Sequence, residues 1–361
     1  MDVEKIKKLR NDLKKGIVVL HGKEARYLVD LFYQIQDFRL GIDNRVRSID
    51  KPVYYNSKGN KRQPTKAEKA SYIPEPHEFL ISVFEEFESF EKDIKDMLTS
   101  YVKSQQIWSW LSEVKGIGPI LAAGLIAHID ITKCPTAGHI WSYAGLNPLQ
   151  EWLAGQKRPF NASLKVICWK IGQSFVKQIG NPDAVYTHLY LKRKAYEEEK
   201  NVNGDYSDQA KTKLKKYNIG KTTDAWLWYS GCFTKETAIK IISIERDDEK
   251  QAIMDKYDLL LEGKKGDAKK EITKERTKEK AALQEEIKVE KREIMDTMVK
   301  KPGEGIQMLP PAHIQQRCER YATKIFLSHL HEVWYEMHFG EKPPAPYPIA
   351  ILGHAHKIEP K

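Results

Sequence analysis

The chain has 361 residues, of which 41% are hydrophobic and 30% charged, and its formal net charge is +10. This length supports two or three domains, and the basic excess favours a polyanionic partner, with nucleic acid ahead of a membrane surface. We expect no membrane span and no secretory signal, hence a cytoplasmic, nucleoid-associated protein, because the start of the chain is charged and no long apolar run occurs. The four cysteines lie far apart without a CxxC pair, which argues against a zinc ribbon or a disulfide scaffold.

The N-terminal region is predicted to be helical. Apolar residues recur at helical spacing from Leu28 to Ile42, and again from Phe79 to Leu98 within residues 77–104. Between these stripes, residues 51–75 are basic and rich in turn-forming residues, which predicts a loop. Stripes of this kind are typical of core or helix-pairing surfaces.

The central and C-terminal parts are also predicted to be helical, with a break at Asn181–Pro182 and a last helix over 311–338 before a proline-rich tail. Residues 245–301 hold sixteen basic and sixteen acidic residues around a thin apolar stripe. This pattern predicts a long coiled-coil-like helix, or a helical hairpin turned at residues 263–266. A homodimer or a hairpin would cover the stripe equally well, and we predict a homodimer.

The predicted fold class is mainly α, with a helix-hairpin-helix core and a long charged helical insert. Four parts are expected: an N-terminal helical region (1–104), a helix-hairpin-helix nucleic-acid-binding domain (105–244), the charged insert (245–301), and a C-terminal helix with its tail (302–361).

A glycine turn interrupts the lysine-rich chain directly after Lys115. Its residues are Gly116, Ile117, Gly118 and Pro119, and a run of small apolar residues follows. We expect a helix that ends at Val114–Lys115, this turn, and a second helix from the proline, which fits the first helical turn because it lacks an N–H.

The same turn offers chemistry. Glycines take positive φ without penalty and leave their N–H groups uncovered, while Ile117 would anchor the turn in the core. Free N–H groups at a helix start, with the positive end of the helix dipole behind them, suit a phosphate. Such a hairpin binds the nucleic-acid backbone and does not read bases. The alternative is an ordinary interhelical turn with a glycine cap.

A second glycine-bearing turn, at Gly145, precedes a predicted loop that contains Lys157, Arg158 and Lys165. Residues 152–221 hold fourteen basic residues against six acidic ones, so the positive charge concentrates after the first glycine turn. Aromatic residues lie between these charges, a pattern that suits nucleic acid and also plain core packing: Tyr143, Trp152 and Phe160.

Four segments resemble, in this order, the C-terminal domain of the bridge-RNA-guided insertion-sequence transposases: VKGIGPILAAGLIAHI, CPTAGHIWSYAGLNP, AGQKRP and LKVICWKIGQSFVK. The resemblance covers residues 107–180. It implies a glycine hairpin, a YAGL-P segment, a basic loop and a following helix that together bind DNA or RNA.

Two departures separate the chain from that family. The family's basic loop carries a nucleophilic serine before its glycine, whereas Ala154 precedes Gly155 here, and the nearest serine, Ser163, does not match the pattern. The family's N-terminal half is an RNase-H-like domain with four acidic residues, whereas residues 1–100 here are predicted to be helical. The resemblance therefore implies binding and does not carry catalysis over.

Other chemistry is weakly indicated. His354 and His356 with Glu359 could hold a metal, and Asp130 with Glu151 could pair, but solvated or capping roles are commoner. Nothing matches a Walker loop, a dinucleotide fingerprint or a protease triad. No cofactor and no metal is expected.

The sequence thus predicts a sequence-tolerant nucleic-acid-binding protein, with DNA preferred over RNA, related to mobile-element transposases and without their serine recombinase chemistry. Two alternatives stay open: an active recombinase or metal-dependent nuclease that uses other acidic residues, and a scaffold that docks a partner through its insert. The predicted contacts to nucleic acid come from nine residues: Lys115, Gly116, Ile117, Gly118, Pro119, Gly145, Lys157, Arg158 and Lys165.

Overall fold

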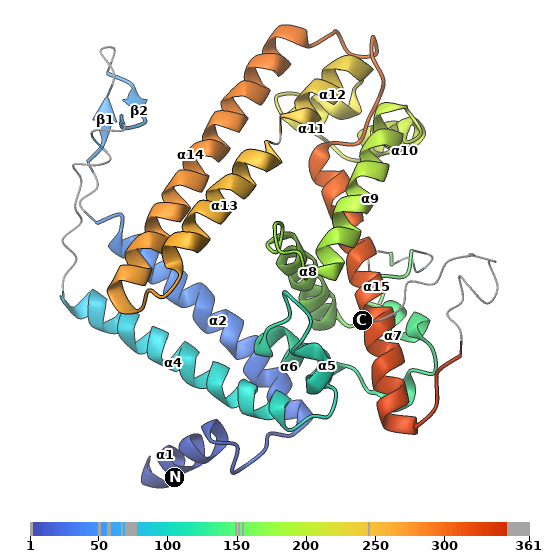
Figure 1. Ribbon diagram of the computed structural model, residues 1–361. Coiled ribbons are helices and arrows are strands. Elements are labelled where there is room, and N and C mark those ends of the chain that lie inside the picture. The colour runs from blue at the N-terminus through green and yellow to red at the C-terminus, as the bar shows by residue number, and fades with distance from the viewer. Residues whose placement is uncertain are drawn as a thin grey trace. The chain divides into compact units, whose positions relative to one another are not determined.

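The computed structural model describes residues 3–49, 52–55, 59–65, 68, 78–148, 150, 152–153, 155–244 and 246–344. Over these residues the protein is mainly α-helical, as predicted (Figure 1). Strands β1 (Tyr54–Tyr55) and β2 (Lys61–Arg62) form a short antiparallel pair within the stretch that was predicted to be a loop. Glu151, Ala154, and the tail that carries His354 and His356 lie outside the described residues.

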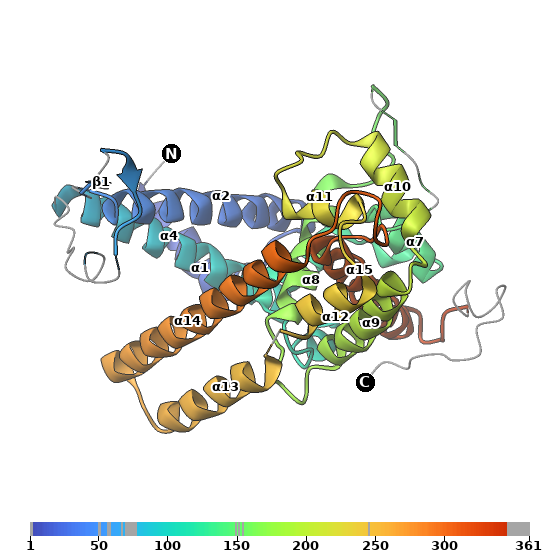
Figure 2. The same cartoon turned by 90° about the horizontal axis from the view of Figure 1, so that it is seen from above.

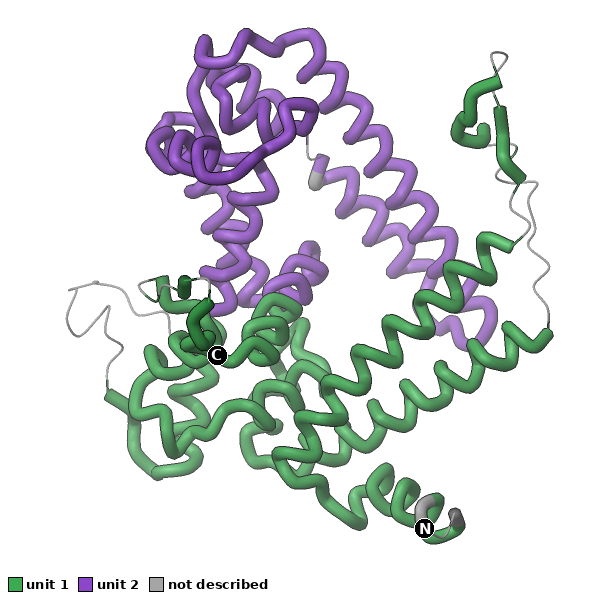
Figure 3. Tube along the Cα trace, turned by 180° about the vertical axis from the view of Figure 1, so that it is seen from behind, with its two compact units in different colours: residues 1–171, 326–361 green, residues 172–325 purple. Residues whose placement is uncertain are grey.

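The chain divides into two compact units, residues 1–171 with 326–361 and residues 172–325 (Figure 3). The division falls within two helices, α8 (Ala162–Val176) and α15 (Pro311–Phe339). The four-part division predicted from the sequence remains a prediction. None of the described helices is long and apolar enough to cross a bilayer.

The first unit is built around two long helices that lie side by side, α2 (Gly22–Val46) and α4 (Glu78–Lys103) (Figures 1 and 2). Their buried residues follow helical spacing, as in Val29 and Phe32 of α2. The buried helix α6 (Pro119–His128) packs against both. The other helices that begin in this unit are α1 (Val3–Lys14), α5 (Trp108–Leu111), the 3-10 helix η1 (Ile131–Lys133) and α7 (Ala137–Tyr143).

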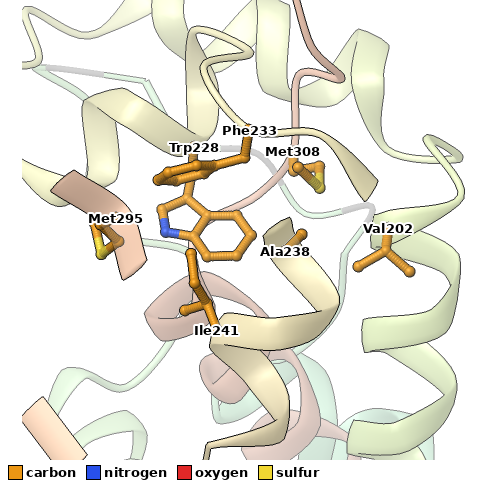
Figure 4. Packing of buried hydrophobic residues seen from close by; sticks show 7 residues of the cluster. All are labelled: Val202, Trp228, Phe233, Ala238, Ile241, Met295 and Met308. Atoms are coloured by element: carbon orange, nitrogen blue, oxygen red, sulfur yellow. The ribbon is translucent and has the colours of Figure 1, made fainter. Parts of the chain in front are cut away.

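The second unit has its own core around Trp228 (Figure 4). The indole ring meets Phe233 edge-on, with ring centroids 5.0 Å apart, and the cluster also holds Val202, Ala238, Ile241, Met295 and Met308. These residues come from distant parts of the sequence. The helices of this unit are α9 (Val185–Val202), α10 (Ser207–Lys216), α11 (Asp224–Tyr229), α12 (Lys235–Ser243), α13 (Asp247–Leu261) and α14 (Gly266–Met298).

The charged insert forms a helical hairpin, which was one of the two forms predicted from the sequence; the other was a single long helix. Helices α13 and α14 lie side by side and are joined through Gly263, whose φ is +71° (Figures 1 and 2). The Lys256 ammonium lies 2.7 Å from the Glu279 carboxylate across the hairpin. Leu283 and Ile287 of the predicted stripe are buried within the unit. The middle of the stripe is therefore covered without a second chain, whereas Met298 at its end is 39% exposed.

Candidate nucleic-acid interface

The glycine turn begins earlier than the sequence predicted. Helix α5 ends at Leu111, not at Val114–Lys115, because the hydrogen bonds that follow span three residues instead of four, as from the Val114 N–H to the Leu111 carbonyl at 3.2 Å. The chain then turns back, with the Ile117 N–H donating to the Val114 carbonyl at 3.0 Å. Lys115 is left exposed beside this turn.

The two glycines of the turn differ in conformation. Gly116 has a φ of +96°, which strains any other L-residue. Gly118 is the N-cap of α6 with φ −93° and ψ 173°, an ordinary extended conformation, and a Cβ there would meet open space. The turn is held in place by Ile117, which is only 6% exposed.

The start of α6 has no side-chain cap. Pro119 occupies the first helical position, and the first helical hydrogen bond runs from the Ala122 N–H to the Gly118 carbonyl at 3.0 Å. Helix geometry therefore leaves the N–H groups of Ile120 and Leu121 without an acceptor inside the helix. These donors and the positive end of the helix dipole make this terminus suited to an anion.

The body of α6 is fixed by close packing. Its residues from Ala122 to His128 are all buried. A Cβ on Gly124 would lie 2.7 Å from the Ile167 Cδ1 of α8, so the missing side chain allows α8 to approach. The run of small residues after the glycine turn is therefore explained by helix packing.

The second turn ends α7 at Gly145. This glycine has a φ of +65°, and the Leu146 N–H donates to the Trp141 carbonyl at 2.8 Å, the pattern of a Schellman cap. A Cβ on Gly145 would lie 2.8 Å from the Phe160 ring. The turn thus requires glycine both for its backbone and for the ring that packs on it.

The basic loop after this turn alternates cations with aromatic rings. The Arg158 guanidinium lies 5.2 Å from the centroid of the Trp152 ring. Trp152 meets Phe160 edge-on with centroids 6.4 Å apart, and the Lys165 ammonium lies 4.2 Å from the centroid of the Phe160 ring. Lys157 is exposed next to this row.

Lys165 does not lie in the loop, as the sequence analysis expected, but in the first turns of α8. The reason is Asn161, whose side-chain oxygen accepts the Leu164 N–H at 2.9 Å and so caps the helix. The same amide donates to the Tyr143 hydroxyl at 2.9 Å and lies 3.4 Å from Nδ1 of His128. Asn161 therefore ties the ends of α6 and α7 to the start of α8.

The structure does not gather the nine predicted residues into one cluster. Gly145, Arg158 and Lys165 come together around the rings, but they lie at the C-terminal end of α6, next to His128. The glycine turn lies at the other end, about 15 Å away for a ten-residue helix. Helix α8 runs antiparallel to α6 between these ends, because Asn161 contacts His128 whereas Ile167 contacts Gly124.

The electrostatics of this region favour an anion. Residues 152–182 contain five basic residues and no aspartate or glutamate. The nearby Asp130 is held by the Thr132 N–H and hydroxyl and by Lys133, which lower the pKa of its carboxyl group. This carboxylate caps η1, and its proposed pairing with Glu151 falls outside the described residues. Burial, with the charge of Arg26, lowers the pKa of His128, which keeps this imidazole neutral.

Two residues of this region escaped the sequence analysis. Asn161 carries a recognisable signal, since an asparagine before a helical apolar period is a common N-cap. Trp169, on α8, is 55% exposed and lies one turn after Lys165. Its signal was its place among basic residues, between Lys165 and Lys170.

Comparison with known proteins finds a family match over this segment. Residues 109–163 match the model of the family described as "Transposase IS116/IS110/IS902 family". The match begins in α5, includes both glycine turns and the basic loop, and ends in the first turn of α8. It confirms a transposase-like resemblance over this minor part of the chain. No curated protein and no solved structure gives a significant match.

Proposed function

We propose that the chain is a sequence-tolerant nucleic-acid-binding protein related to mobile-element transposases, with DNA as its preferred partner. The observation that carries the proposal is the matched segment itself, because residues 109–163 hold both the uncapped start of α6 and the basic loop. DNA is preferred over RNA because the family is named for transposases, which act on DNA.

The proposed binding mode is a helix-hairpin-helix contact to the phosphate backbone. One phosphate would accept from the N–H groups at the start of α6, where Gly118 lets it approach and Lys115 adds charge. A second would meet Arg158 and Lys165 at the other end of α6. Contacts of this kind position a protein on nucleic acid and carry no base sequence information.

We propose that the serine chemistry of the resembled transposases is absent. Ala154 precedes Gly155, and an alanine side chain cannot attack a phosphodiester. We therefore expect no covalent protein–DNA intermediate through this loop. A homodimer and an association with the nucleoid complete the proposal, because a protein that holds two DNA segments gains from two copies of its binding site.

Substitutions at Gly118 test the proposed function, because the extended backbone and open space there admit side chains without strain. Gly118→Ala adds no hydrogen-bonding group, so affinity for a short DNA duplex should stay near wild type. Gly118→Asp should keep α6 folded, since aspartate is a good N-cap, but its carboxylate would occupy the proposed phosphate position. We expect binding to fall at least about tenfold, the effect of about 1.4 kcal/mol.

Gly118→Asn is the matched control, because it caps the helix without a charge and should give an intermediate affinity. Fluorescence anisotropy with labelled duplex measures binding, and circular dichroism verifies the fold. Equal affinity of all three folded variants would remove the phosphate site from α6. A wild-type protein that binds no nucleic acid at low salt would refute the proposed function.

A further inference from the structure

Large aromatic side chains are exposed along one strip of the first unit. Trp169 is 55% exposed and Trp152 is 45% exposed, and Leu153 and Val166 beside them are also exposed. Tryptophan is usually well covered in folded proteins. Exposed apolar groups gathered in one place commonly mark a binding surface.

Three ring contacts link Trp152 to the cations of the basic loop and of α8, and helical spacing places Trp169 next to them. Arg158 lies over Trp152, Trp152 meets Phe160, and Lys165 lies over Phe160. Trp169 follows Lys165 by four residues on α8, so both side chains lie on the same side of that helix. We name this row, from Arg158 through Trp152, Phe160 and Lys165 to Trp169, the aromatic strip.

The fold does not account for the exposed rings of the aromatic strip. The buried contacts of α8 come from other positions, namely Leu164, Ile167, Cys168 and Ile171. Trp152 is held in place, since its indole N–H donates to the Gln156 carbonyl at 2.7 Å. The exposed faces of both rings are thus left open to a ligand.

We propose that the aromatic strip binds unpaired nucleobases by stacking, with Trp169 as the main platform and Trp152 as the second. The preferred ligand is then single-stranded nucleic acid, or a junction with unpaired bases, ahead of a closed duplex. This inference rests on the proposed function and names its substrate class.

The chemistry of the strip matches this ligand. A stacked base needs an open aromatic ring face, and its phosphate needs a nearby cation. Aromatic rings and cations alternate along the strip. Stacking tolerates every base, which agrees with sequence-tolerant binding. Residues 152–182 contain no carboxylate to repel a phosphate, and Glu151, which precedes Trp152, lies outside the described residues.

The position of α8 agrees with a nucleic-acid strand that runs along this helix. Because Asn161 contacts His128 whereas Ile167 contacts Gly124, α8 leads from the C-terminal end of α6 toward the end that carries the glycine turn, and Trp169 follows Ile167 on α8. The strip therefore extends from the basic loop in the direction of the first proposed phosphate contact, at the start of α6. A flexible single strand can follow such a line with its bases turned toward the rings.

The test compares probes that differ in their bases alone. Wild-type protein, Trp169→Ala and Trp169→Phe are titrated with a short oligothymidylate, with an abasic strand of the same length, and with a closed duplex. We expect wild type to bind the oligothymidylate about 5- to 100-fold more tightly than the abasic strand. Trp169→Ala should bring that ratio close to one, and Trp169→Phe should keep much of it. Trp152→Ala should lower the ratio by a smaller factor.

Tyr27→Ala is the matched control, since Tyr27 is 76% exposed on α2 and lies outside the aromatic strip and outside the matched segment. It should leave the ratio unchanged. An oligouridylate arm distinguishes DNA from RNA as the source of the bases. If Trp169→Ala keeps the wild-type ratio, the stacking inference is wrong, while continued binding of duplex would leave the proposed function standing. If no probe binds at low salt, both fail.

Discussion

The two glycines of the first turn illustrate how a single residue can be required by the fold or left free by it. Gly116 is needed because its φ of +96° is costly for any other L-residue. Gly118 is not needed by the backbone, since its conformation is ordinary and no atom stands where a Cβ would be. A glycine that the fold does not require, at an uncapped helix start, is the strongest residue-level argument for an approaching ligand.

A histidine in the second unit predicts how stability depends on pH. Burial, and then the charges of Lys213, Arg320 and Arg317, lower the pKa of His313 to about 4, well below about 6.5 in an unfolded chain. As pH falls through the range between these values, His313 becomes protonated in the unfolded chain, whereas it stays neutral in the folded protein. Stability therefore falls as pH falls from about 6.5 to about 4 and levels off below.

The measurement is the melting temperature at pH 7 and at pH 5, for wild type and for His313→Gln. Glutamine can keep a hydrogen bond to the Tyr229 hydroxyl, which lies 3.0 Å from Nδ1 of His313. The variant should lose less stability than wild type between the two pH values. Burial lowers the pKa of His128 and His331 too, so part of the dependence should remain. Equal losses in the two proteins would exclude His313 as a contributor.

At the scale of elements, the hairpin of α13 and α14 changes which residues could form the contact in the predicted homodimer. Leu283 and Ile287 of its stripe are buried within the second unit, and Met295 beside the stripe belongs to the core around Trp228. The most exposed apolar side chain of the insert is Leu259, at the distal end of α13, which is 73% exposed, and its neighbour Leu260 is 47% exposed; on α14, Val289 is 50% exposed. If the insert makes a dimer, we expect the two adjacent leucines to contribute to the contact.

Removing the distal half of the hairpin tests the dimer. Replacing residues 257–278 with four Gly and Ser residues keeps Met295 in the core, and such a bridge spans the distance between packed helices, about 8–10 Å. We expect a dimeric parent and a monomeric deletion variant that still binds a short DNA. Light scattering gives the molar mass, and Leu259→Ser with Leu260→Ser is the smaller change that should act in the same direction. A parent that is monomeric at micromolar concentration would refute the dimer.

Local patterns predicted the elements well where one rule decided the outcome. Helical spacing predicted α4 and α15 to within a residue or two at each end, because their apolar stripes are long and their ends carry breaking residues. The early end of α5 was not predicted, because the change to hydrogen bonds that span three residues after Leu111 carries no residue signal such as Gly or Pro. The placement of Lys165 on α8 was missed because the capping role of Asn161 was overlooked.

For the molecule as a whole, composition predicted where charge gathers but not how far apart the candidate contacts lie. The acid-free stretch 152–182 and the neutral insert 245–301 are both evident in the sequence. The separation of the glycine turn from the basic loop along α6 depends on the contacts of Asn161 and Gly124, which no local pattern reveals. The nine predicted residues therefore form an extended candidate interface and not a compact site.

A pair of charge reversals tests whether binding depends on this surface or on net charge alone. Lys157→Glu with Arg158→Glu, and Lys264→Glu with Lys265→Glu in the hairpin turn, lower the net charge by the same amount, and all four side chains are exposed. If the loop contacts two phosphates, the first variant should reduce the slope of log affinity against log salt on a duplex by about 1.8, because fewer counterions are released. The second variant should keep the wild-type slope, since the insert is neutral overall and lies outside the matched segment. Equal reductions in the two variants would mean that attraction is set by net charge, and the basic loop would lose its proposed role.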